Sequence, residues 1–453
     1  MHPLCFHAQG VYSFVKNSRI MLIYCPVISH RLNYIADFTG RLLTGEAARV
    51  THDRDEFIAA DTIRINYSEE RLTPDECWIK PHSLLFETGI REQPIICSEW
   101  NMMPVFFQTD GELPFDIFAA AFYLISRYEE YLPHQEDIYG RYDHTQSLAF
   151  REGFLNRPVV DGWMQQFKML LKRIFPSAQL AVKHFQWIPT YDIDEAYSFK
   201  YKSWTRSAGA ALRDLFTGRF SHFSQRRKVL NGKQEDPFDS YSWINDLHRP
   251  HQLSPVYFFL VGEKNGRYDK QILPSQTAMQ TLIHQHAVKY KIGLHPSWQS
   301  GDDKTMLQAE KERLEKISGL KITASRQHYI RMKLPITYRQ LLEAGIREDY
   351  SMGYGSVNGF RASYSNAYFW YDLEKEEQTL LLLHPFCYME ANSFFEQKYT
   401  VLQALDEMHY YFNELKRMEG TLITIWHNTF LGTAPLFNGW REVYAQFTKE
   451  VTT

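Results

Sequence analysis

From about residue 185 onward, the chain alternates between short apolar runs and amphipathic helical stretches. Helical patterns cover residues 273–290, 303–318, 335–344 and 394–418. Such alternation is typical of parallel sheets covered by helices, so it predicts an α/β fold with a parallel sheet, either open or closed into a barrel. Six apolar runs are the candidate strands: FQWIPTYDID, SPVYFFLVG, YKIGLHPS, SRQHYIR, TLLLLHPF and TLITIWHN.

The ends of these candidate strands carry polar side chains. In both open and closed parallel sheets, functional side chains collect at the carboxyl ends of the strands. Packing alone gives little reason for charged or histidine side chains there, so we expect the chemistry at this edge of the sheet. Five of the six runs end in this way, with Asp192 and Asp194, His295, Arg331, His384 and His427.

The chain before residue 185 has a different pattern. Short strand-like segments and turns run from residue 21 to about residue 110, and two helical stretches follow at 114–132 and 159–175. The next segment, PSAQLAVKHFQ, has the composition of a linker. We therefore predict an N-terminal α+β domain over residues 1–185 and an α/β domain over residues 186–453.

Composition limits the functional classes. Of the 453 residues, 44% are hydrophobic, so the chain can bury sizeable cores, and the net charge of −3 gives no reason to expect nucleic acid binding. The five cysteines are odd in number and form no CxxC pair, which argues against a disulfide framework or a zinc–thiolate site. No GxGxxG opens a helix after a strand, and the motifs GxxxxGK[ST], GxSxG and HExxH are absent.

The chain has no segment that resembles a membrane span, because no apolar run reaches the roughly 18 residues needed. The run IMLIYCPVI, residues 20–28, follows two basic residues but has no small-residue cleavage site after it. We therefore predict a buried strand there and a cytoplasmic protein. Met21 is an alternative start, which would make residues 1–20 an extra leader.

Residues 200–233 form a basic segment. They carry nine lysines or arginines against one acid, Asp214, with aromatic residues between them. One interpretation is a solvated amphipathic helical excursion. The other is a basic face for an anionic polymer, a phosphate-bearing lipid or a membrane surface.

Asp192 and Asp194 stand two positions apart at a strand end, so their side chains point to the same side. Two carboxylates about 6 Å apart repel each other unless a cation lies nearby. A divalent metal or an arginine would supply this cation. The alternative without chemistry is a pair of aspartates that caps a loop.

Four further residues fit a catalytic site around these aspartates. His295 suits a ligand of zinc or a similar ion, and His427 suits general acid work on a leaving group, although either could be a core histidine. Arg326 could keep Asp192 ionised, and Asp349 could bond His427 and raise its pKa. Ordinary salt bridges are the alternative for Arg326 and Asp349.

Taken in order, the segments TYDID, SPVYFFLVG, HPSWQ, SRQ and IWH resemble the motifs of the NodB-like polysaccharide deacetylases. The resemblance implies a distorted (β/α) barrel and a metal-dependent carbohydrate deacetylase with a divalent ion, expected to be zinc. It also implies a role for each site residue: Asp192 is the general base, Asp194 and His295 bind the metal, Arg326 holds the base, Asp349 tunes the acid, and His427 is the general acid.

The chain departs from the family at one metal position. Gln299 stands where the family has its second metal-binding histidine, and glutamine is a poor zinc ligand. The predicted metal set is thus Asp194, His295 and Gln299, which leaves two alternatives. Either a looser site takes another donor from elsewhere in the chain, or metal binding has been lost.

The N-terminal half carries a second resemblance. PFDIFAAAFYLISRYEEYL, GRYDHTQSLAF and NRPVVDGW resemble the uncharacterised domain that often precedes such deacetylases in bacteria of the Bacteroidetes type. Together, the two resemblances imply removal of N-acetyl groups from a sugar of an envelope or exported glycan. The alternative is an inactive barrel that binds a glycan or a partner protein in surface-polysaccharide assembly.

Overall fold

The computed structural model of the protein describes residues 20–202 and 220–452. The chain forms two compact units. The first, here the N-terminal unit, comprises Met1–Phe86, Phe107–Ala119 and Met164–Val182, and the second, the C-terminal unit, comprises Glu87–Phe106, Ala120–Trp163 and Lys183–Thr453. The domain boundary near residue 185 stays a prediction.

The N-terminal unit is built on a parallel four-stranded sheet with the order β2-β1-β3-β4. Helix α1 begins where the Ser29 hydroxyl accepts a hydrogen bond from the Leu32 N–H, and it ends at Gly45 in the left-handed conformation. The predicted buried strand after residue 20 is confirmed as β1. The elements are β1 (Met21–Tyr24), α1 (His30–Thr44), β2 (Arg49–Thr51), α2 (Arg54–Ala59), β3 (Ile63–Tyr67) and β4 (Cys77–Ile79).

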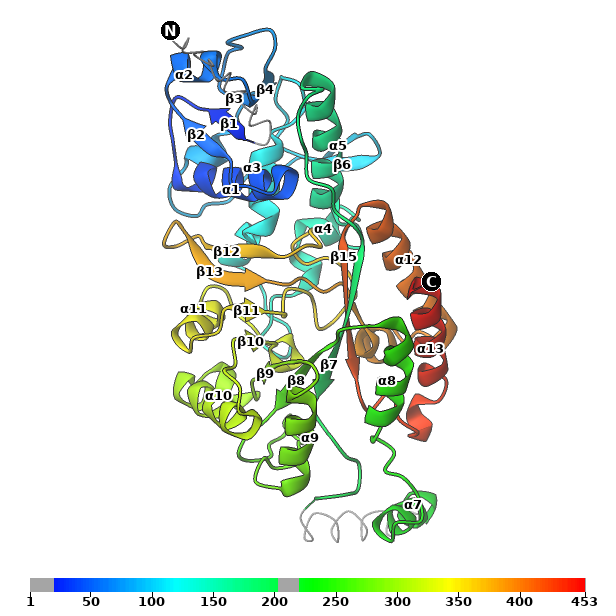
Figure 1. The fold of residues 1–453 in the computed structure, drawn as a ribbon. Helices are drawn as coiled ribbons and strands as arrows, with labels where there is room; N and C mark the ends of the chain where they lie inside the picture. The colour runs from blue at the N-terminus through cyan, green and yellow to red at the C-terminus, as the bar shows by residue number, and fades with distance from the viewer. Residues whose placement is uncertain (1–19, 203–219, 453) are drawn as a thin grey trace, which may run out of the picture. The chain divides into compact units, whose positions relative to one another are not determined.

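The C-terminal unit contains a nine-stranded sheet with the order β12-β13-β11-β10-β9-β8-β7-β15-β14 (Figure 1). Every strand pair in it is parallel except β12–β13, as the alternating pattern predicts. The strands are β7 (Gln186–Ile193), β8 (Val256–Leu260), β9 (Lys291–His295), β10 (Ala324–Ser325), β11 (Glu348–Asp349), β12 (Tyr368–Asp372), β13 (Glu377–Leu383), β14 (Tyr388–Met389) and β15 (Thr421–His427).

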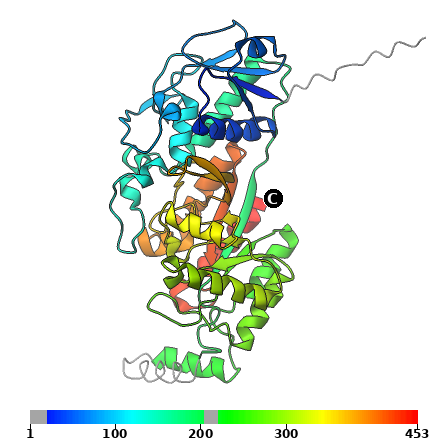
Figure 2. The ribbon, with the colours of Figure 1, turned by 90° about the vertical axis from the view of Figure 1, so that its left-hand side faces the viewer.

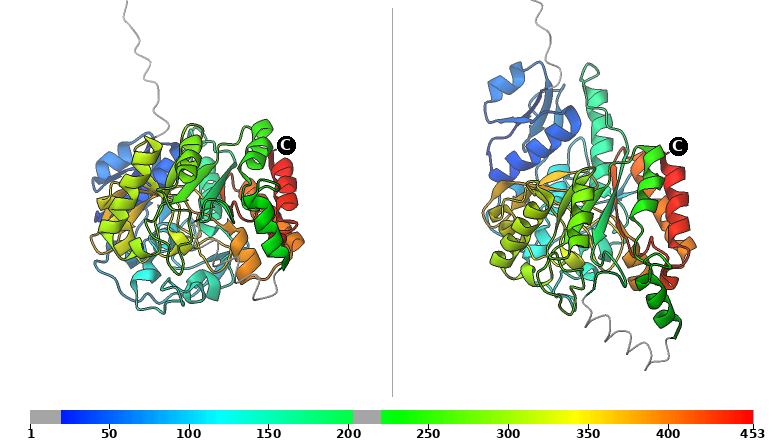
Figure 3. Two further views of the ribbon diagram at one scale, coloured as in Figure 1. Left: turned by 90° about the horizontal axis from the view of Figure 1, so that it is seen from below. Right: turned by 60° about the horizontal axis from the view of Figure 1, so that its bottom comes forward.

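Helices flank the two sides of this sheet. Figures 1 and 2 show α9, α10 and α11 outside one part of it and α8, α12 and α13 outside the other, and Figure 3 shows the strands between these two groups. All five residues of β8 are buried, as expected for a strand covered on both faces. The helices are α7 (Phe220–Leu230), α8 (Tyr241–His248), α9 (Thr277–Ala287), α10 (Lys304–Ser318), α11 (Ile336–Glu343), α12 (Val401–Arg417) and α13 (Trp440–Thr452).

The sheet does not close into a barrel through paired strands. Among the described residues, no strand pair joins its two end strands, β12 and β14. Instead, residues 384–387 lead directly from β13, which pairs with β11, to β14, which pairs with β15. The chain itself thus connects the two ends of the parallel array, and this connection brings the residue after β14 beside the end of β15.

Two predicted elements are shorter than the sequence pattern indicates. The run SRQHYIR contributes only the last residue of β10, and its later residues form a 3-10 turn, His328–Ile330, in which Tyr329 and Ile330 are left-handed with φ of 60° and 53°. The predicted helix over 394–418 begins at residue 401, where Thr400 and Gln403 form a capping box. A π-helix, Asn392–Glu396, precedes it.

Residues 87–106 and 120–163 pack within the C-terminal unit. Helix α3 (Ile117–Ile125) lies partly in this segment and α5 (Val159–Ile174) lies mostly in the N-terminal unit; they correspond to the predicted helices 114–132 and 159–175. The first helix ends early because Arg127 is left-handed, with φ of 57°. The remaining elements are β5 (Ser98–Trp100), β6 (Met103–Val105) and α4 (Leu148–Arg151).

The basic segment lies largely outside the described residues, which omit 203–219. Within the described part, Arg226 of α7 is buried, with its guanidinium 4.7 Å from the centre of the Phe199 ring. One of the nine basic side chains is therefore used in packing. In the part of the chain that the structure describes, no helix is long and apolar enough to cross a membrane.

A buried ion-pair cluster ties residues 120–163 to the loop after β11. Glu130 accepts hydrogen bonds from Arg361, at 2.6 and 2.8 Å, and from Arg127, at 2.7 Å. All three side chains are at most 3% exposed. Burial by itself would raise the pKa of Glu130, but the two guanidinium groups outweigh it and hold the pKa at about 2.

We predict that Glu130→Gln destabilises the protein by about 3–5 kcal/mol at pH 7, because it leaves the buried Arg361 guanidinium without its carboxylate and leaves Arg127 with only Glu129. The folded pKa lies below the unfolded value, so this contribution is present above about pH 4.5 and is lost as the pH falls toward 2. Urea unfolding at several pH values measures both effects.

Glu414→Gln is the matched control, because Glu414 pairs with Arg417 on the surface and should contribute less than about 1 kcal/mol. The stability difference between wild type and Glu130→Gln should shrink on acidification. A difference that stays constant from pH 7 to pH 2 would contradict the assigned role of Glu130.

Candidate metal centre

The carboxyl ends of β7, β9, β10 and β15 bring five predicted site residues together. Asp192 lies in β7 beside His427 of β15, its partner in the strand register. Asp194 follows β7 directly, His295 is the last residue of β9, and Arg326 follows β10. Because these strands are parallel neighbours, or are separated only by β8, their ends meet at one edge of the sheet.

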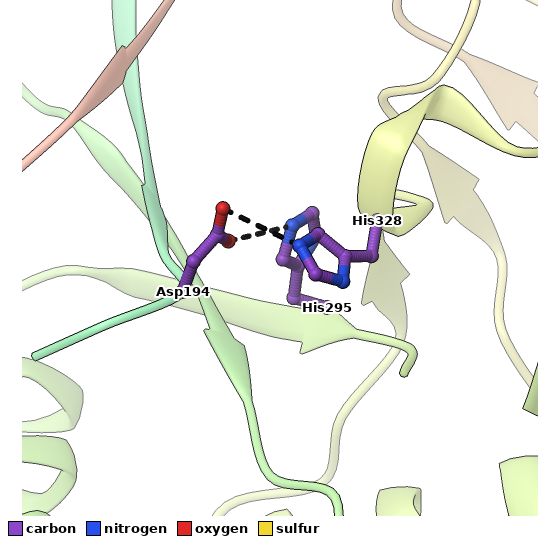
Figure 4. Close-up of side chains that lie close together, drawn as sticks. All are labelled: Asp194, His295 and His328. Atoms are coloured by element: carbon purple, nitrogen blue, oxygen red, sulfur yellow. Dashed lines mark ion pairs between the residues drawn. The ribbon is translucent and has the colours of Figure 1, made fainter. Parts of the chain in front are cut away.

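Asp194, His295 and His328 form a group of three possible metal ligands. One ligand atom from each lies within 4.8 Å of the others. Asp194 Oδ1 lies 3.1 Å from His295 Nε2, and Asp194 Oδ2 lies 3.4 Å from His328 Nε2 (Figure 4). Donors bound at 2.0–2.2 Å to a tetrahedral zinc ion are roughly 3.3–3.6 Å apart, and both distances from Asp194 to the histidines are near this range.

The outer nitrogens of the two histidines fix which nitrogen faces Asp194. His295 Nδ1 donates a hydrogen bond to the Arg326 carbonyl at 2.6 Å, and His328 Nδ1 donates to Asp269 at 3.0 Å. In the neutral form of each ring, Nε2 then carries a lone pair directed at the carboxylate, which is repulsive unless a proton or a metal ion lies between them. It is also the arrangement in which histidine binds metals.

Asp194 itself has a second feature that suits a cation ligand. Its Oδ1 atom is buried and makes no hydrogen bond, despite the short distance to His295. A buried carboxylate oxygen without a hydrogen bond is costly unless a cation satisfies it. The residues present therefore fit a divalent ion of the zinc type.

The charges in this group shift two pKa values. Burial would raise the pKa of Asp194, but the positive charge that His328 carries when protonated outweighs it and holds the pKa well below its ordinary value. Burial would lower the pKa of His328, but Asp194 and Asp269 raise it to about 9. Each group thus stabilises the charged form of the other.

His427 lies on the other side of Asp194, with Nε2 3.5 Å from Asp194 Oδ2. Its Nδ1 and its main-chain N–H both donate to Glu390 Oε1, each at 2.7 Å. Burial lowers the pKa of His427, but the Glu390 carboxylate raises it, with help from Asp194 and Asp192, to about 10. His427 is therefore held as a proton donor that faces the ligand group.

Asp192 lies beside Arg326, as predicted for a base held ionised by an arginine. Arg326 Nη1 donates to Asp192 Oδ1 at 3.0 Å and to Thr190 Oγ1 at 2.6 Å. The guanidinium is fully buried and lies 4.6 Å from the centre of the Phe258 ring. Packing and hydrogen bonds thus fix Arg326 and, through it, the Asp192 carboxylate.

Two predicted site residues lie elsewhere. Gln299 is exposed on a short 3-10 turn after Trp298 and does not line the cavity that contains Asp194 and His295, whereas His328 lies beside both as a third possible donor. Asp349 makes its hydrogen bonds to Ser325 and Ser351 rather than to His427, and Glu390 occupies the place expected for it. Burial raises the pKa of Asp349 to about 6.

Asp349 nevertheless supports the site indirectly. Its carboxylate accepts from the Ser351 hydroxyl at 3.0 Å, and the same hydroxyl accepts from the Gln327 N–H at 2.9 Å. Asp349 therefore helps to place the loop that carries Arg326 and His328.

The sequence contained a weak signal for each missed residue. His328 stands two positions after Arg326 in SRQHYIR, a run interpreted as a strand that ends in arginine. Glu390 follows an apolar stretch that ends in CYM, which repeats the pattern of a carboxylate at a strand end. Neither residue matches the spacing of the family motifs, so only the spatial arrangement reveals them.

A cavity of about 550 Å³ opens onto the ligand group. Asp192, Asp194, His295, His328 and His427 all line it. Three tyrosines that are neither fully buried nor fully exposed contribute to its wall: Tyr139, Tyr268 and Tyr329. A cavity of this size holds a sugar unit, and aromatic rings can pack against the apolar face of one.

The loop that carries His328 has an unusual backbone. Tyr329 and Ile330, both non-glycine residues, are left-handed in succession, at a cost of roughly 1–3 kcal/mol each. Strain of this kind is retained where the surrounding structure fixes it, often at functional sites. The position of His328 is therefore not one that the loop would adopt alone.

Comparison with known sequences gives one family match. Residues 21–176 match DUF7033, a family of unknown function. The matched region lies in the half of the chain where the sequence resembles an uncharacterised domain. A search of curated protein sequences found no significant match.

Several solved structures are similar to this chain. The polysaccharide deacetylase Bc1974 from Bacillus cereus has 10% sequence identity and a TM-score of 0.30, with 59% of this chain and 88% of that chain covered. Puue allantoinase has 10% identity and a TM-score of 0.39, with 59% and 85% covered. A mutant of BA3943, a CE4 family pseudoenzyme with restored activity, has 9% identity and a TM-score of 0.24, with 58% and 62% covered. The function is therefore argued from the geometry of the site.

If Asp194, His295 and His328 are the metal ligands, two substitutions should differ in their effect on zinc affinity. His328→Ala should lower zinc affinity at least about tenfold, since it removes one of three protein donors, whereas Gln299→Ala should leave the affinity unchanged. Titration of the metal-free protein with zinc in the presence of a competing chelator measures both. Weakened binding in Gln299→Ala with normal binding in His328→Ala would contradict the assignment.

Proposed function

We propose that the protein is a metal-dependent hydrolase that removes N-acetyl groups from an amino sugar of an envelope or exported glycan. The observation that carries this proposal is the convergence of His295, His328 and His427 on Asp194, with the arginine-held Asp192 alongside. Hydrolysis of an amide needs an electrophile, a base for water and an acid for the leaving amine. The site offers residues suited to each task.

Asp194, His295 and His328 would hold a divalent ion, with zinc the best fit to this donor set. When bound, such an ion supplies Lewis acidity toward the amide carbonyl and toward water. Asp269 and the Arg326 carbonyl hold the outer nitrogens of the two histidines and keep both rings aimed at the ion position.

Asp192 is the proposed general base. Arg326 Nη1 donates to one carboxylate oxygen, Oδ1, at 3.0 Å and so fixes the group that must accept a proton from the attacking water. The same arginine donates to Thr190 and to the Tyr350 carbonyl, so the base is kept in one orientation. Orientation of this kind matters because a proton acceptor must lie within hydrogen-bond reach of the water.

His427 is the proposed general acid. Glu390 favours its protonated form and fixes the ring so that Nε2 faces the cavity side of Asp194. A protonated imidazole in this position can give its proton to the departing amine, so the sugar nitrogen leaves as a neutral group. The tyrosines of the cavity wall support a sugar as the group that carries this amine.

The alternative was an inactive barrel that only binds a glycan or a partner, and it rested on Gln299 in place of a metal-binding histidine. His328 supplies a third donor from the neighbouring strand end, which removes that reason. The donor set, the base and the acid all favour the hydrolase.

Substitution of the base and of the acid tests this proposal. Asp192→Asn and His427→Asn should each lower kcat for acetate release from N-acetylglucosamine oligomers by roughly 100-fold or more, while zinc content stays unchanged. Asp246→Asn, at an exposed aspartate paired with Arg249, is the matched control. If wild-type protein loaded with zinc releases no acetate from any N-acetylated sugar, the proposal fails.

Glu390→Gln tests whether Glu390, and not Asp349, is the carboxylate partner of the proposed acid, His427. Without the Glu390 carboxylate, the protonated form of His427 is less stabilised. The kcat should therefore fall by roughly tenfold or more, with little change in KM. Asp349 does not contact His427, so Asp349→Asn should lower stability more than it lowers kcat. Equal kinetic effects from both variants, at equal stability, would contradict the role given to Glu390.

A further inference from the structure

The loop from Gln327 to Ile330 presents His328 in a backbone conformation that it would not adopt by itself. Tyr329 has φ of 60° and ψ of 11°, and Ile330 has φ of 53°. Two successive non-glycine residues in this region need contacts from outside the loop to hold them. The contacts that do so identify residues with a role in metal binding.

Arg141 makes the main outside contact. Its Nη1 donates to the Tyr329 carbonyl at 2.7 Å, and its Nε donates to Asp137 at 2.7 Å. The side chain is 6% exposed, and its guanidinium lies 4.8 Å from the centre of the Tyr139 ring. The buried guanidinium is therefore fixed in place, and it donates to the peptide group between Tyr329 and Ile330, one residue beyond His328.

The turn that carries Arg141 is itself well ordered by hydrogen bonds. Asp137 Oδ1 accepts from the N–H groups of Tyr139 and Arg141, at 2.9 and 3.0 Å. The Asp137 N–H in turn donates to the Arg141 carbonyl at 2.8 Å. Asp137 thus organises the turn with one oxygen and holds the guanidinium with the other.

Gly355 leaves the space that this contact needs. A Cβ atom at residue 355 would lie 2.1 Å from Arg141 Nη1 and 2.8 Å from the Tyr329 carbonyl oxygen. Both distances are too short for a side chain, so any residue larger than glycine must displace the arginine or the carbonyl. The close contact with Arg141 and Tyr329, and not a left-handed backbone, therefore requires glycine at residue 355.

We propose that Asp137, Arg141 and Gly355 form a clamp that holds His328 in place as the third ligand of the metal ion. The inference rests on the proposed metal site. Arg141 is a positioning residue: it fixes the Tyr329 carbonyl, and the fixed peptide sets where the His328 ring lies. Asp269 holds only the outer nitrogen of that ring.

The clamp also assigns a role to part of the region of unknown function. Asp137 and Arg141 lie within residues 21–176, the stretch that matches DUF7033, whereas His328 lies nearly two hundred positions later in the chain. Both belong to the same compact unit. This part of the matched region thus completes the metal site and does not act as a separate module.

Without the clamp, the loop is free to leave the left-handed conformation, and His328 Nε2 loses its fixed distance from Asp194. Asp194 and His295 keep their own positions, because the end of β7 and the hydrogen bond from His295 to Arg326 hold them. Ion affinity should therefore fall without being abolished. Residues that orient metal ligands from outside typically contribute 10–100-fold to affinity.

The test uses the full chain in metal-free form and two variants that break the clamp from different sides, Arg141→Gln and Gly355→Ala. The control is Arg339→Gln, which makes the same chemical change in the same unit at an arginine that binds Asp372 at 2.7 and 2.8 Å. Zinc affinity is measured by competition with a chelator, and cobalt absorption spectra report the ligand geometry. Urea unfolding in chelator confirms that each variant is folded.

Both clamp variants should bind zinc about 10–100-fold more weakly than wild type and show an altered cobalt spectrum, whereas Arg339→Gln stays within about twofold. Folded clamp variants with wild-type affinity and spectrum would overturn the clamp, and so would an equal loss in Arg339→Gln. A wild-type protein that binds no divalent ion overturns the clamp together with the metal site. A wild-type protein that binds zinc but releases no acetate overturns only the proposed function.

Discussion

The site depends on one electrostatic constraint. The outer nitrogens of His295, His328 and His427 are all occupied by hydrogen-bond acceptors, so the inner nitrogens of all three rings face the single carboxylate of Asp194. Such an arrangement is unfavourable unless positive charge lies among these groups, whether as protons or as a metal ion. The buried Arg141, the buried carboxylates of Asp269 and Glu390, and the strained loop Gln327–Ile330 hold this arrangement in place. We infer that the positive charge has a function.

Much of the fold follows from patterns that the sequence shows directly. Apolar runs predict β7, β8, β9 and β15 because parallel strands are buried on both faces, and Asp192, Asp194, His295 and His427 follow from their places at the strand ends. The pairing of Asp192 with Arg326 follows from the need of a carboxylate for a nearby cation. The pattern does not show that the parallel array is joined end to end by residues 384–387, because that depends on how far the sheet curves.

The rest of the site could not be predicted, because it depends on backbone details that no local pattern encodes. His328 lies in a run with strand-like composition, and it faces Asp194 only because the chain turns left-handed directly after it. Glu390 replaces Asp349 because β14 pairs with β15 and carries it to the His427 main chain. Arg141 stands far from all of these residues in the sequence, so only the folded structure brings it to the Tyr329 carbonyl.

The most direct test of the account is to locate the ion. Crystals grown with zinc, with diffraction recorded on both sides of the zinc absorption edge, show the ion as an anomalous difference peak. The account predicts one peak about 2.0–2.2 Å from an Asp194 oxygen and from the Nε2 atoms of His295 and His328, with Gln299 outside the ligand sphere. The absence of a peak between these residues at saturating zinc, or a peak ligated by Gln299 instead of His328, would contradict it.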